Sequence, residues 1–327
     1  MMRSKKNNSI LDGLNQPHVS VVVPAYNAAH TISQAINSIL AQSFIDFELI
    51  ICNDASIDKT QSILETHFDY RLQIITNEKN LGAGLSRDRA IAISKGEWLA
   101  FGDADDLWQP NRLEKLLQAA GADTNVMVFD DIMICHDVNN NLVRWRPVHG
   151  QKAFGTHGVY ARDIRLEEYI RSNRLVVQPI IPSHIVKKNK LQHSNRRFAE
   201  DAEFFIRVAL AGARLRYLPE PLYLYRITPG SATAVASDTS LMRRCLEDCM
   251  HIENIPEAVQ QALMDKIAAL RVNESLYKLV AICRQYEFSQ AIKLIRQEPK
   301  LLRILPRRLS KHLAYQIHRV IHGGHPR

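Results

Sequence analysis

The sequence lacks long apolar runs and any recognisable leader. No stretch approaches the roughly 18 consecutive apolar residues that a membrane-spanning helix needs. Residues 1–16 are polar and basic and have no apolar centre of the kind that marks a secretion signal. We therefore expect a protein without a membrane span, with residues 1–16 as a flexible basic segment.

Cysteines are few, and their spacing suggests no disulfide pattern. The 5 cysteines contain no C-x-x-C pair and no regular ladder, which predicts reduced thiols in a cytoplasmic protein. Cys245, Cys249 and His251 lie close enough in the sequence to hold zinc. Without a second cluster of ligands, their spacing is more typical of one face of a helix.

Two common nucleotide-binding loops are also missing. No G-x-x-x-x-G-K-[ST] segment occurs, which excludes a P-loop NTPase, and no G-x-G-x-x-G follows the first apolar run, which argues against a dinucleotide oxidoreductase. A nucleotidyltransferase should carry a basic, glycine-rich loop after its first strand. Pro24–Asn27 stands at that place and is not such a loop.

Short apolar runs alternate with helical patterns over the first 130 residues or so. Ile32, Ile36 and Ile39 follow the spacing of a core-facing helix, Asp58 has the character of a helix N-cap, and Pro110 suits a first helical turn. This alternation predicts a doubly wound α/β fold with a mostly parallel sheet. The expected strands are Val19–Val23, Phe47–Cys52, Leu72–Thr76, Trp98–Phe101 and Val126–Phe129.

The pattern changes twice further along the chain. Residues 131–230 are mixed, with one clear helix near Glu200–Ala211, and helical patterns dominate after Ser231. We expect a catalytic domain over residues 17–231 and a helical, basic C-terminal region over residues 232–327.

Polar side chains follow three of the expected strands, at the edge where parallel sheets bind ligands. These strand ends are Pro24–Asn27, Asn53–Ser56 and Gly102–Asp106. Taken singly, each has an ordinary explanation: a packed tyrosine, a turn, or a helix cap. Three acids within four residues after a buried strand repel one another unless a cation joins them. Mg²⁺ or Mn²⁺ with oxygen ligands meets that requirement and leaves positions for a diphosphate.

A second acidic site, Glu200 and Asp201, opens the helix that follows it. Acids in a first helical turn stabilise the helix dipole, and a carboxylate here could equally act as a general base toward a hydroxyl. The residues alone leave both interpretations open.

Together these segments resemble the family 2 glycosyltransferases. The resemblance spans residues 17–231, in order and at sensible spacings, and its first half ends in a G-E-[YW]…D-x-D-D pattern. The matching segments are Val19–Asn27, Asn53–Asp58, Asn80–Gly82 with Ser86–Asp88, Gly96–Trp108, Phe198–Phe204, and Tyr225–Arg226 with Gly230–Ser231.

The resemblance implies a GT-A fold and an inverting, single-displacement transfer of sugar from a nucleotide donor, by family habit a UDP-sugar. By position, Asp103 and Asp105 would bind Mn²⁺ or Mg²⁺ and Asp201 would be the general base. The remaining donor-site positions are Pro24, Tyr26, Asn27, Asp54 and Arg87, with Asp103 also able to contact ribose.

Three positions depart from the family pattern. Asn53 and Asp88 replace a usual Asp and Asn, and Thr228 stands where many relatives have a histidine near the metal. Arg226 could supply positive charge in its place. The expected function is transfer to a glycan or lipid-linked acceptor in surface polysaccharide biosynthesis. A non-catalytic nucleotide-sugar-binding subunit of the same fold is the alternative.

The positive charge is concentrated near the C-terminus. From residue 291 onward nine Lys and Arg face the single acid Glu298, which accounts for the net charge of +8 of the whole chain. Leucines and isoleucines alternate with these cations, so residues 291–327 could lie on an anionic membrane as a peripheral contact at its inner face. A helix packed on the protein body explains the pattern equally well. Few aromatics and no known motif argue against nucleic acid.

Overall fold

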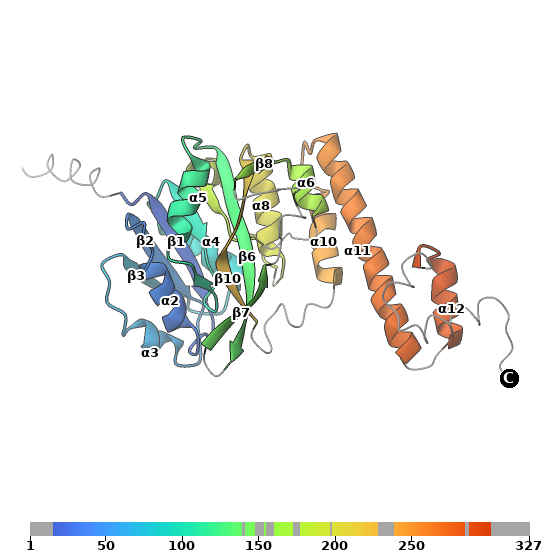
Figure 1. Ribbon diagram of the computed structural model, residues 1–327, viewed down its shortest axis with the longest axis horizontal. Helices are drawn as coiled ribbons and strands as arrows, with labels where there is room; N and C mark the ends of the chain where they lie inside the picture. Colours follow the sequence, from blue (N-terminus) through green and yellow to red (C-terminus); the bar gives the residue numbers. More distant parts are fainter. Residues whose placement is uncertain are drawn as a thin grey trace, which may run out of the picture. The chain divides into compact units, whose positions relative to one another are not determined.

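The computed structural model describes residues 16–138, 141–147, 154, 160–172, 177–196, 198–227, 239–284 and 288–301. The chain divides into two compact units, Met1–Ala234 and Val235–Arg327 (Figure 1). The expectations for residues 1–15, for Thr228 and for the basic tail beyond residue 301 fall outside the described residues.

The first unit alternates strands and helices along its first half. Its elements in chain order are β1 (Val19–Ala25), α2 (Ile32–Leu40), β2 (Phe47–Asn53), α3 (Thr60–Leu64), β3 (Leu72–Thr76), α4 (Ala83–Ile93), β4 (Trp98–Phe101), β5 (Leu107–Trp108), α5 (Arg112–Ala120), β6 (Val126–Val138), β7 (Asn141–Pro147), β8 (Arg162–Ile164), α6 (Leu166–Arg171), β9 (Ile180–Pro182), α7 (Ser183–Lys188), α8 (Glu200–Leu210) and β10 (Arg214–Ile227).

The described strands form one sheet in the order β3-β2-β1-β4-β9-β6-β10-β5, with β7 added to β6 and β8 to β10. β1 runs parallel to β2 and β4, and β6 runs parallel to β10, while β9 is antiparallel between β4 and β6. After β3 the chain crosses to the other side of β1. The carboxyl ends of β1 and β4 therefore mark the point at which open α/β sheets bind ligands. The prediction of a doubly wound, mostly parallel sheet is confirmed.

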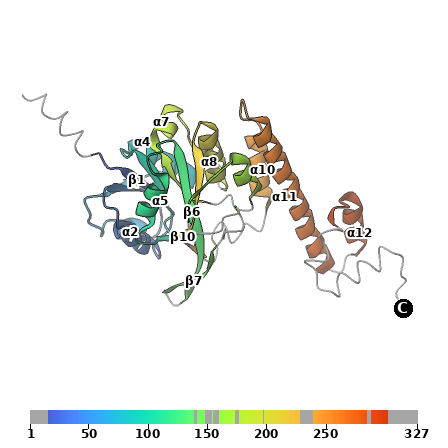
Figure 2. The ribbon, with the colours of Figure 1, turned by 45° about the horizontal axis from the view of Figure 1, so that its top comes forward.

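Helices cover both faces of this sheet. On one face, Val21 and Val23 of β1 belong to a buried cluster with Ile36 of α2 and Leu113 of α5. On the other face, the ring of Phe101 in β4 lies against α8, and α4 packs on β1 and β2. The alternate side chains of β1 and β4 thus pack on both faces of the sheet, as their largely apolar sequences indicated. The β6–β7 hairpin extends beyond the rest of the sheet (Figure 2).

The first four predicted strands match β1 to β4 to within two residues, but two long strands differ from expectation. β6 continues to Val138 instead of ending at Phe129. The acids that seemed to end it are accommodated, because buried Asp130 is paired with Arg112 of α5 at 2.9 Å. β10 carries prolines within a run expected to be irregular, and register shifts beside Pro221 accommodate them.

Two predicted helix starts are also displaced. Lys59, not Asp58, is the N-cap of α3, although the Asp58 carboxylate accepts the Thr60 N–H at 2.9 Å. α5 begins at Arg112 with Asn111 as its N-cap, so Pro110 precedes the helix instead of lying in its first turn.

The second unit consists of α10 (Thr239–Cys249), α11 (Glu257–Arg284) and α12 (Phe288–Gln297) over its described part. Leu276 and Leu279 of α11 form a small core with Ala291 and Ile295 of α12, within the region where helical patterns were expected. Cys245 and Cys249 are buried thiols, and within the described residues no three metal-ligating side chains gather around a common point. No described helix is both long and apolar enough to cross a bilayer.

Candidate active site

The loops after β1 and β2 are joined by hydrogen bonds. Asn27 donates its backbone N–H to the Ser56 hydroxyl at 3.0 Å, and its side-chain oxygen accepts the Ile57 N–H at 2.9 Å. Asn27 and Ala55 both adopt positive φ, at 50° and 57°. Local strain of this kind is typical of functional sites. The Tyr26 side chain remains 48% exposed at this edge, whereas Pro24 is buried within β1.

Asp54 is buried and organises the loop that leads into α4. Its carboxylate accepts the N–H groups of Leu81 at 2.7 Å and Gly82 at 2.8 Å, and the Asn77 amide at 2.6 Å. Gly82 has φ of 89°, a conformation that favours glycine. Three of about four acceptor positions of a carboxylate are therefore filled from within the protein. Asp54 is thus primarily a loop-ordering residue in this structure.

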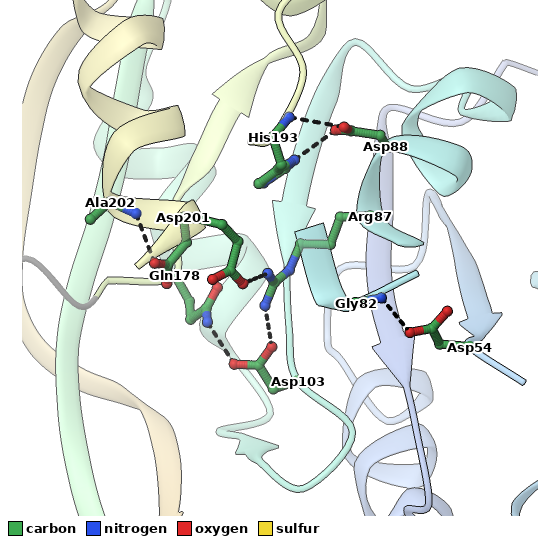
Figure 3. Close-up of polar contacts among 10 residues, drawn as sticks. Asp54, Gly82, Arg87, Asp88, Asp103, Gln178, His193, Asp201 and Ala202 are labelled. Carbon is green, nitrogen blue, oxygen red and sulfur yellow. Dashed lines mark hydrogen bonds and ion pairs between the residues drawn. The ribbon is translucent and has the colours of Figure 1, made fainter. Parts of the chain in front are cut away.

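Arg87 of α4 lies at the centre of an acidic cluster (Figure 3). Its guanidinium contacts Asp103 at 2.6 Å and Glu200 at 2.9 Å, and Gln178 donates to the second oxygen of Asp103 at 2.7 Å. Burial lowers the pKa of Arg87, but the charges of Asp103 and Glu200 outweigh it and hold the pKa above its usual value. Arg87 therefore stays charged and joins the end of β4 to the start of α8.

Asp201 stands in the first turn of α8, next to this cluster. Burial and the charge of Glu200 raise its pKa to about 7, although Arg87 acts in the opposite direction. Its Oδ1 accepts the Ala202 N–H at 2.7 Å. The helix begins directly after Ala199, which adopts φ of 61°. A carboxyl group with a pKa near neutrality is suited to proton transfer.

The three carboxylates of the acidic turn after β4 differ in their burial. Asp106 is buried, and its carboxylate accepts the Arg226 N–H at 2.8 Å. Burial, followed by the charges of Asp105 and Asp103, raises its pKa well above the usual value. Asp106 is thus a buried structural acid and not a helix cap, while Asp103 and Asp105 are partly exposed.

The fit of a divalent cation follows from this arrangement. Mg²⁺ and Mn²⁺ sites commonly use one or two carboxylates and take their remaining ligands from water and substrate phosphates. Asp103 and Asp105 offer carboxylate oxygens at one edge, and their charges contribute to the raised pKa of Asp106. A cation would offset this concentrated negative charge. The residues therefore fit such an ion, with Asp103 already engaged by Arg87 and Gln178.

The Arg226 guanidinium forms hydrogen bonds with other parts of the protein. Its Nε donates to the Asp105 carbonyl at 2.8 Å, and its two terminal nitrogens contact Asp137 and Gln34. This side chain fixes the acidic turn against α2 and β6. These three contacts use three of its five guanidinium N–H donors, and the side chain is buried.

Sequence reasoning missed a buried pair, Asp88 and His193. The imidazole Nδ1 lies 2.6 Å from the Asp88 carboxylate, which also accepts the His193 backbone N–H at 2.9 Å. Asp88 had been recognised as a departure from the family pattern, but nothing near His193 in the sequence indicated its partner. Gln178 and Tyr223, which contact Asp103, likewise gave no local signal.

Comparison with known sequences identifies relatives along most of the chain. The profile of Glycosyl transferase family 2 matches residues 20–181. An uncharacterised glycosyltransferase of Methanocaldococcus jannaschii is 30% identical, over 65% of this chain and 72% of the relative. Succinoglycan biosynthesis protein ExoO of Rhizobium meliloti is 25% identical, over 94% and 89%. The Escherichia coli glucosyltransferase WfgD, named for UDP-Glc and a diphosphoundecaprenol acceptor, is 35% identical, but over only 41% and 52%.

Solved structures agree on the fold. TarS of S. aureus, in complex with UDP-GlcNAc, superimposes with a TM-score of 0.62 at 23% identity, over 76% of this chain and 71% of that one. The mannosyltransferase PcManGT of Pyrobaculum calidifontis, in complex with GDP-Man and Mn²⁺, gives 0.61 at 15% identity, over 94% and 80%. With its sheet order and acidic strand ends, the chain is a glycosyltransferase of family 2 with the GT-A fold.

Proposed function

We propose that this enzyme transfers a sugar, with inversion, from a UDP-sugar to a hydroxyl of a glycan or lipid-linked acceptor in surface polysaccharide biosynthesis. The observation that carries the proposal is Asp201, a carboxyl group with a pKa raised to about 7 beside the Arg87–Asp103 pair. The family relatives named for succinoglycan and for a UDP-Glc-dependent transfer to a lipid diphosphate support the donor and acceptor classes.

The proposed mechanism is a single displacement. Asp201 removes the proton of the acceptor hydroxyl while its oxygen bonds to the anomeric carbon, and the bond from that carbon to the donor diphosphate breaks on the opposite face. This inverts the anomeric configuration and leaves the nucleoside diphosphate with the bonding electrons. A pKa near 7 lets the same carboxylate be deprotonated at neutral pH and still accept the proton.

The donor side would be held by the ends of β1 and β4. We assign base stacking to the exposed ring of Tyr26, with Pro24 and Asn27 shaping that loop and Asp54 ordering its neighbour. Asp105, with Asp103, would hold Mn²⁺ or Mg²⁺, whose charge offsets that of the leaving diphosphate when it is bound. The ion pair with Arg87 fixes the position of the Asp103 carboxylate.

A donor panel tests this proposal. Purified enzyme is incubated with UDP-, GDP- and dTDP-sugars, with and without Mn²⁺ or Mg²⁺, and thermal stabilisation and donor hydrolysis are measured. We expect a metal-dependent response to a UDP-sugar. Asp105→Ala should abolish metal-dependent donor binding, whereas Asp201→Ala should bind donor and lose turnover by about 10²-fold or more.

The matched control is Asp46→Ala, which removes an exposed acid at the opposite end of β2 and should change neither property. Loss of donor binding in Asp201→Ala would contradict the division of roles. Retained turnover in that variant would overturn Asp201 as the base. Thermal stabilisation by a donor without any turnover would favour the alternative of a non-catalytic nucleotide-sugar-binding subunit, and no response to any donor would overturn both.

The wider organisation is part of the same proposal. Residues 17–231 would form the catalytic domain and residues 232–327 a helical basic region. A cytoplasmic enzyme with a peripheral contact through residues 291–327 would meet a lipid-linked acceptor at the inner face of the membrane.

A further inference from the structure

The imidazole of His193 lies where three elements of the active site meet. Its side chain is fully buried. The ring stacks on Phe204 of α8, with centroids 3.9 Å apart and planes at 12°, and meets the edge of Phe101 at the end of β4 at 6.3 Å. The Asp88 carboxylate of α4 contacts the ring at Nδ1 and also accepts the His193 backbone N–H.

Each contact of this ring is made by a close neighbour of a reacting or binding residue. Asp88 follows Arg87 in α4, and Phe101 precedes Asp103 by two residues. Phe204 lies three residues after Asp201 and four after Glu200, so it stands one turn further along the same side of α8. A shift of the His193 ring would therefore move the first turn of α8 relative to α4.

Helix α4 approaches His193 and the start of α8 unusually closely. A Cβ atom placed on Gly84 of α4 would lie 2.8 Å from the His193 Cβ and 3.0 Å from the Glu200 Cγ. Glycine thus lets α4 contact both the histidine and the acid that precedes Asp201. Packing of this density leaves little freedom for independent movement.

The protonation of the pair follows from its surroundings. Burial lowers the pKa of His193, although the hydrogen bond to Asp88 acts against this, so the ring is neutral near pH 7. Asp88 accepts from the backbone N–H and from Nδ1–H, which leaves Nε2 as a bare acceptor. That atom is buried and has no hydrogen-bond partner among the described residues. The imidazole is therefore held by its Nδ1 contact and by stacking alone.

We propose that Asp88 and His193 are positioning residues for the transfer: together they fix the first turn of α8 so that Asp201 reaches the acceptor hydroxyl. This inference rests on the proposed role of Asp201 as general base. Neither residue contacts the reacting atoms. Their effect should therefore fall on turnover, since donor binding depends on the ends of β1, β2 and β4.

The test compares kcat and donor Kd in His193→Phe, Asp88→Ala and the double variant. His193→Phe keeps an aromatic ring against Phe204 but loses the Nδ1 donor. We expect kcat to fall by about 10- to 100-fold in each single variant, because a displacement near 1 Å can cost that much. Donor Kd should stay within about 2-fold. The double variant should lose little more than the worse single one, since both act through one contact.

Asp88→Asn provides the conservative rescue. Its amide oxygen can accept the His193 N–H while its NH₂ donates to Nδ1 of the other neutral tautomer. We expect this variant to retain kcat within about 3-fold. His18→Phe is the matched control, because it removes another histidine–carboxylate pair, with Glu97 at 3.2 Å, beside the opposite end of β4. It should leave kcat unchanged.

Hydrogen exchange separates this inference from the proposed function. In His193→Phe and Asp88→Ala, amides at residues 198–204 should lose protection whether or not any donor is turned over. Asp201→Asn should abolish turnover and keep that protection. Wild-type kcat in both single variants would overturn the positioning role, and so would a loss of kcat and donor affinity together in proportion to the melting temperature.

Discussion

At the scale of single residues, Asp201 combines two opposing electrostatic influences. Burial and Glu200 raise its pKa to about 7, and Arg87 lowers it. A general base works when deprotonated, so kcat should fall as the pH drops below about 7. Glu200→Gln removes a negative charge and releases Arg87 from its ion pair with Glu200. Both changes favour the deprotonated form of Asp201. The pKa should therefore decrease, and the acid limb of the kcat profile should move to lower pH.

The control for this profile is Glu203→Gln, which neutralises another acid in the first turn of α8. Glu203 pairs with Arg196 and Arg207 instead of Arg87. Its removal should leave the acid limb in place. A limb that moves to higher pH in Glu200→Gln would show that Glu200 does not act on Asp201 through its charge.

Ala199 offers a second prediction at this scale. It adopts φ of 61° directly before Glu200, a left-handed conformation that costs an alanine roughly 1–2 kcal/mol. Ala199→Gly removes this strain but gives the unfolded chain more freedom, so we expect a net stabilisation of about 0.5–1 kcal/mol. The melting temperature should rise, and kcat should fall because the first turn of α8 is less firmly held.

Ala211→Gly is the matched control at the other end of α8. Ala211 has φ of −77°, which alanine adopts without strain, so this change should lower the melting temperature. If Ala199→Gly also lowers it, the left-handed alanine stores no strain.

Single residues also show where sequence reasoning stops. Asp103 and Asp105 are recognisable as acids at a strand end and Asp201 as an acid at a helix start, and the resemblance to the family supplied their expected roles. The contacts of Arg87 with Glu200 and of Asp88 with His193 join residues more than 100 positions apart. No local periodicity encodes such pairs, so they appear only once the sheet order brings α4 beside α8.

At the scale of elements, a buried ion pair fixes α5 to β6. Arg112 contacts both carboxylate oxygens of Asp130, at 3.0 and 2.9 Å, and donates to the Gln178 carbonyl. Its guanidinium also lies over the rings of Trp108 and Tyr223, at 4.4 and 4.9 Å. Gln178 in turn holds Asp103. This pair therefore supports the site as well as the fold.

Arg112→Met should lower the free energy of unfolding by about 3–5 kcal/mol, because it leaves Asp130 buried without its cation. Urea unfolding followed by tryptophan fluorescence measures the loss. Adding Asp130→Asn should recover part of it. Arg165→Met removes an exposed cation that pairs with Glu168 and should cost less than about 1 kcal/mol. Equal losses of unfolding free energy in Arg112→Met and Arg165→Met would show that burial of the Arg112–Asp130 pair does not matter.

The elements themselves were predictable to different degrees. β1 to β4 are rich in apolar residues and are bounded by polar ones, so their limits follow from the sequence to within two residues. The full lengths of β6 and β10 were not predictable in this way, because Asp130 and the prolines of β10 resemble strand breaks. They remain strands only because a distant arginine neutralises the acid and because bulges accommodate the prolines.

At the scale of the whole molecule, chemistry and charge lie in different parts of the sequence. The described site residues all belong to the first unit, Met1–Ala234. Residues 302–327 carry six Lys and Arg and no acid, against a net charge of +8 for the chain. Cations near an anionic membrane surface contribute about 1 kcal/mol each to binding. If residues 291–327 form the proposed peripheral membrane contact and not a helix packed on the protein body, this contact should be separable from catalysis.

Vesicle sedimentation with charge-neutralised variants tests that separation. The enzyme should sediment with vesicles containing phosphatidylglycerol and not with pure phosphatidylcholine, and 1 M salt should release it, since the Debye length then falls to about 3 Å. Replacing Arg303, Arg307, Arg308 and Lys311 by Gln should weaken binding by about 10²-fold or more. Replacing the exposed Lys95, Arg165, Lys188 and Lys190 of the first unit by Gln is the control and should change binding little.

Turnover of a soluble acceptor completes this experiment. Because the proposed base and metal ligands lie in the first unit, the tail-neutralised enzyme should keep its kcat in solution and lose activity only toward an acceptor embedded in anionic vesicles. Equal vesicle binding by the two variants would assign the membrane contact to net charge alone. No binding by the unmodified enzyme would mean that the basic residues form only a solvated surface, and an equal loss of solution turnover would mean that the tail supports the catalytic unit directly.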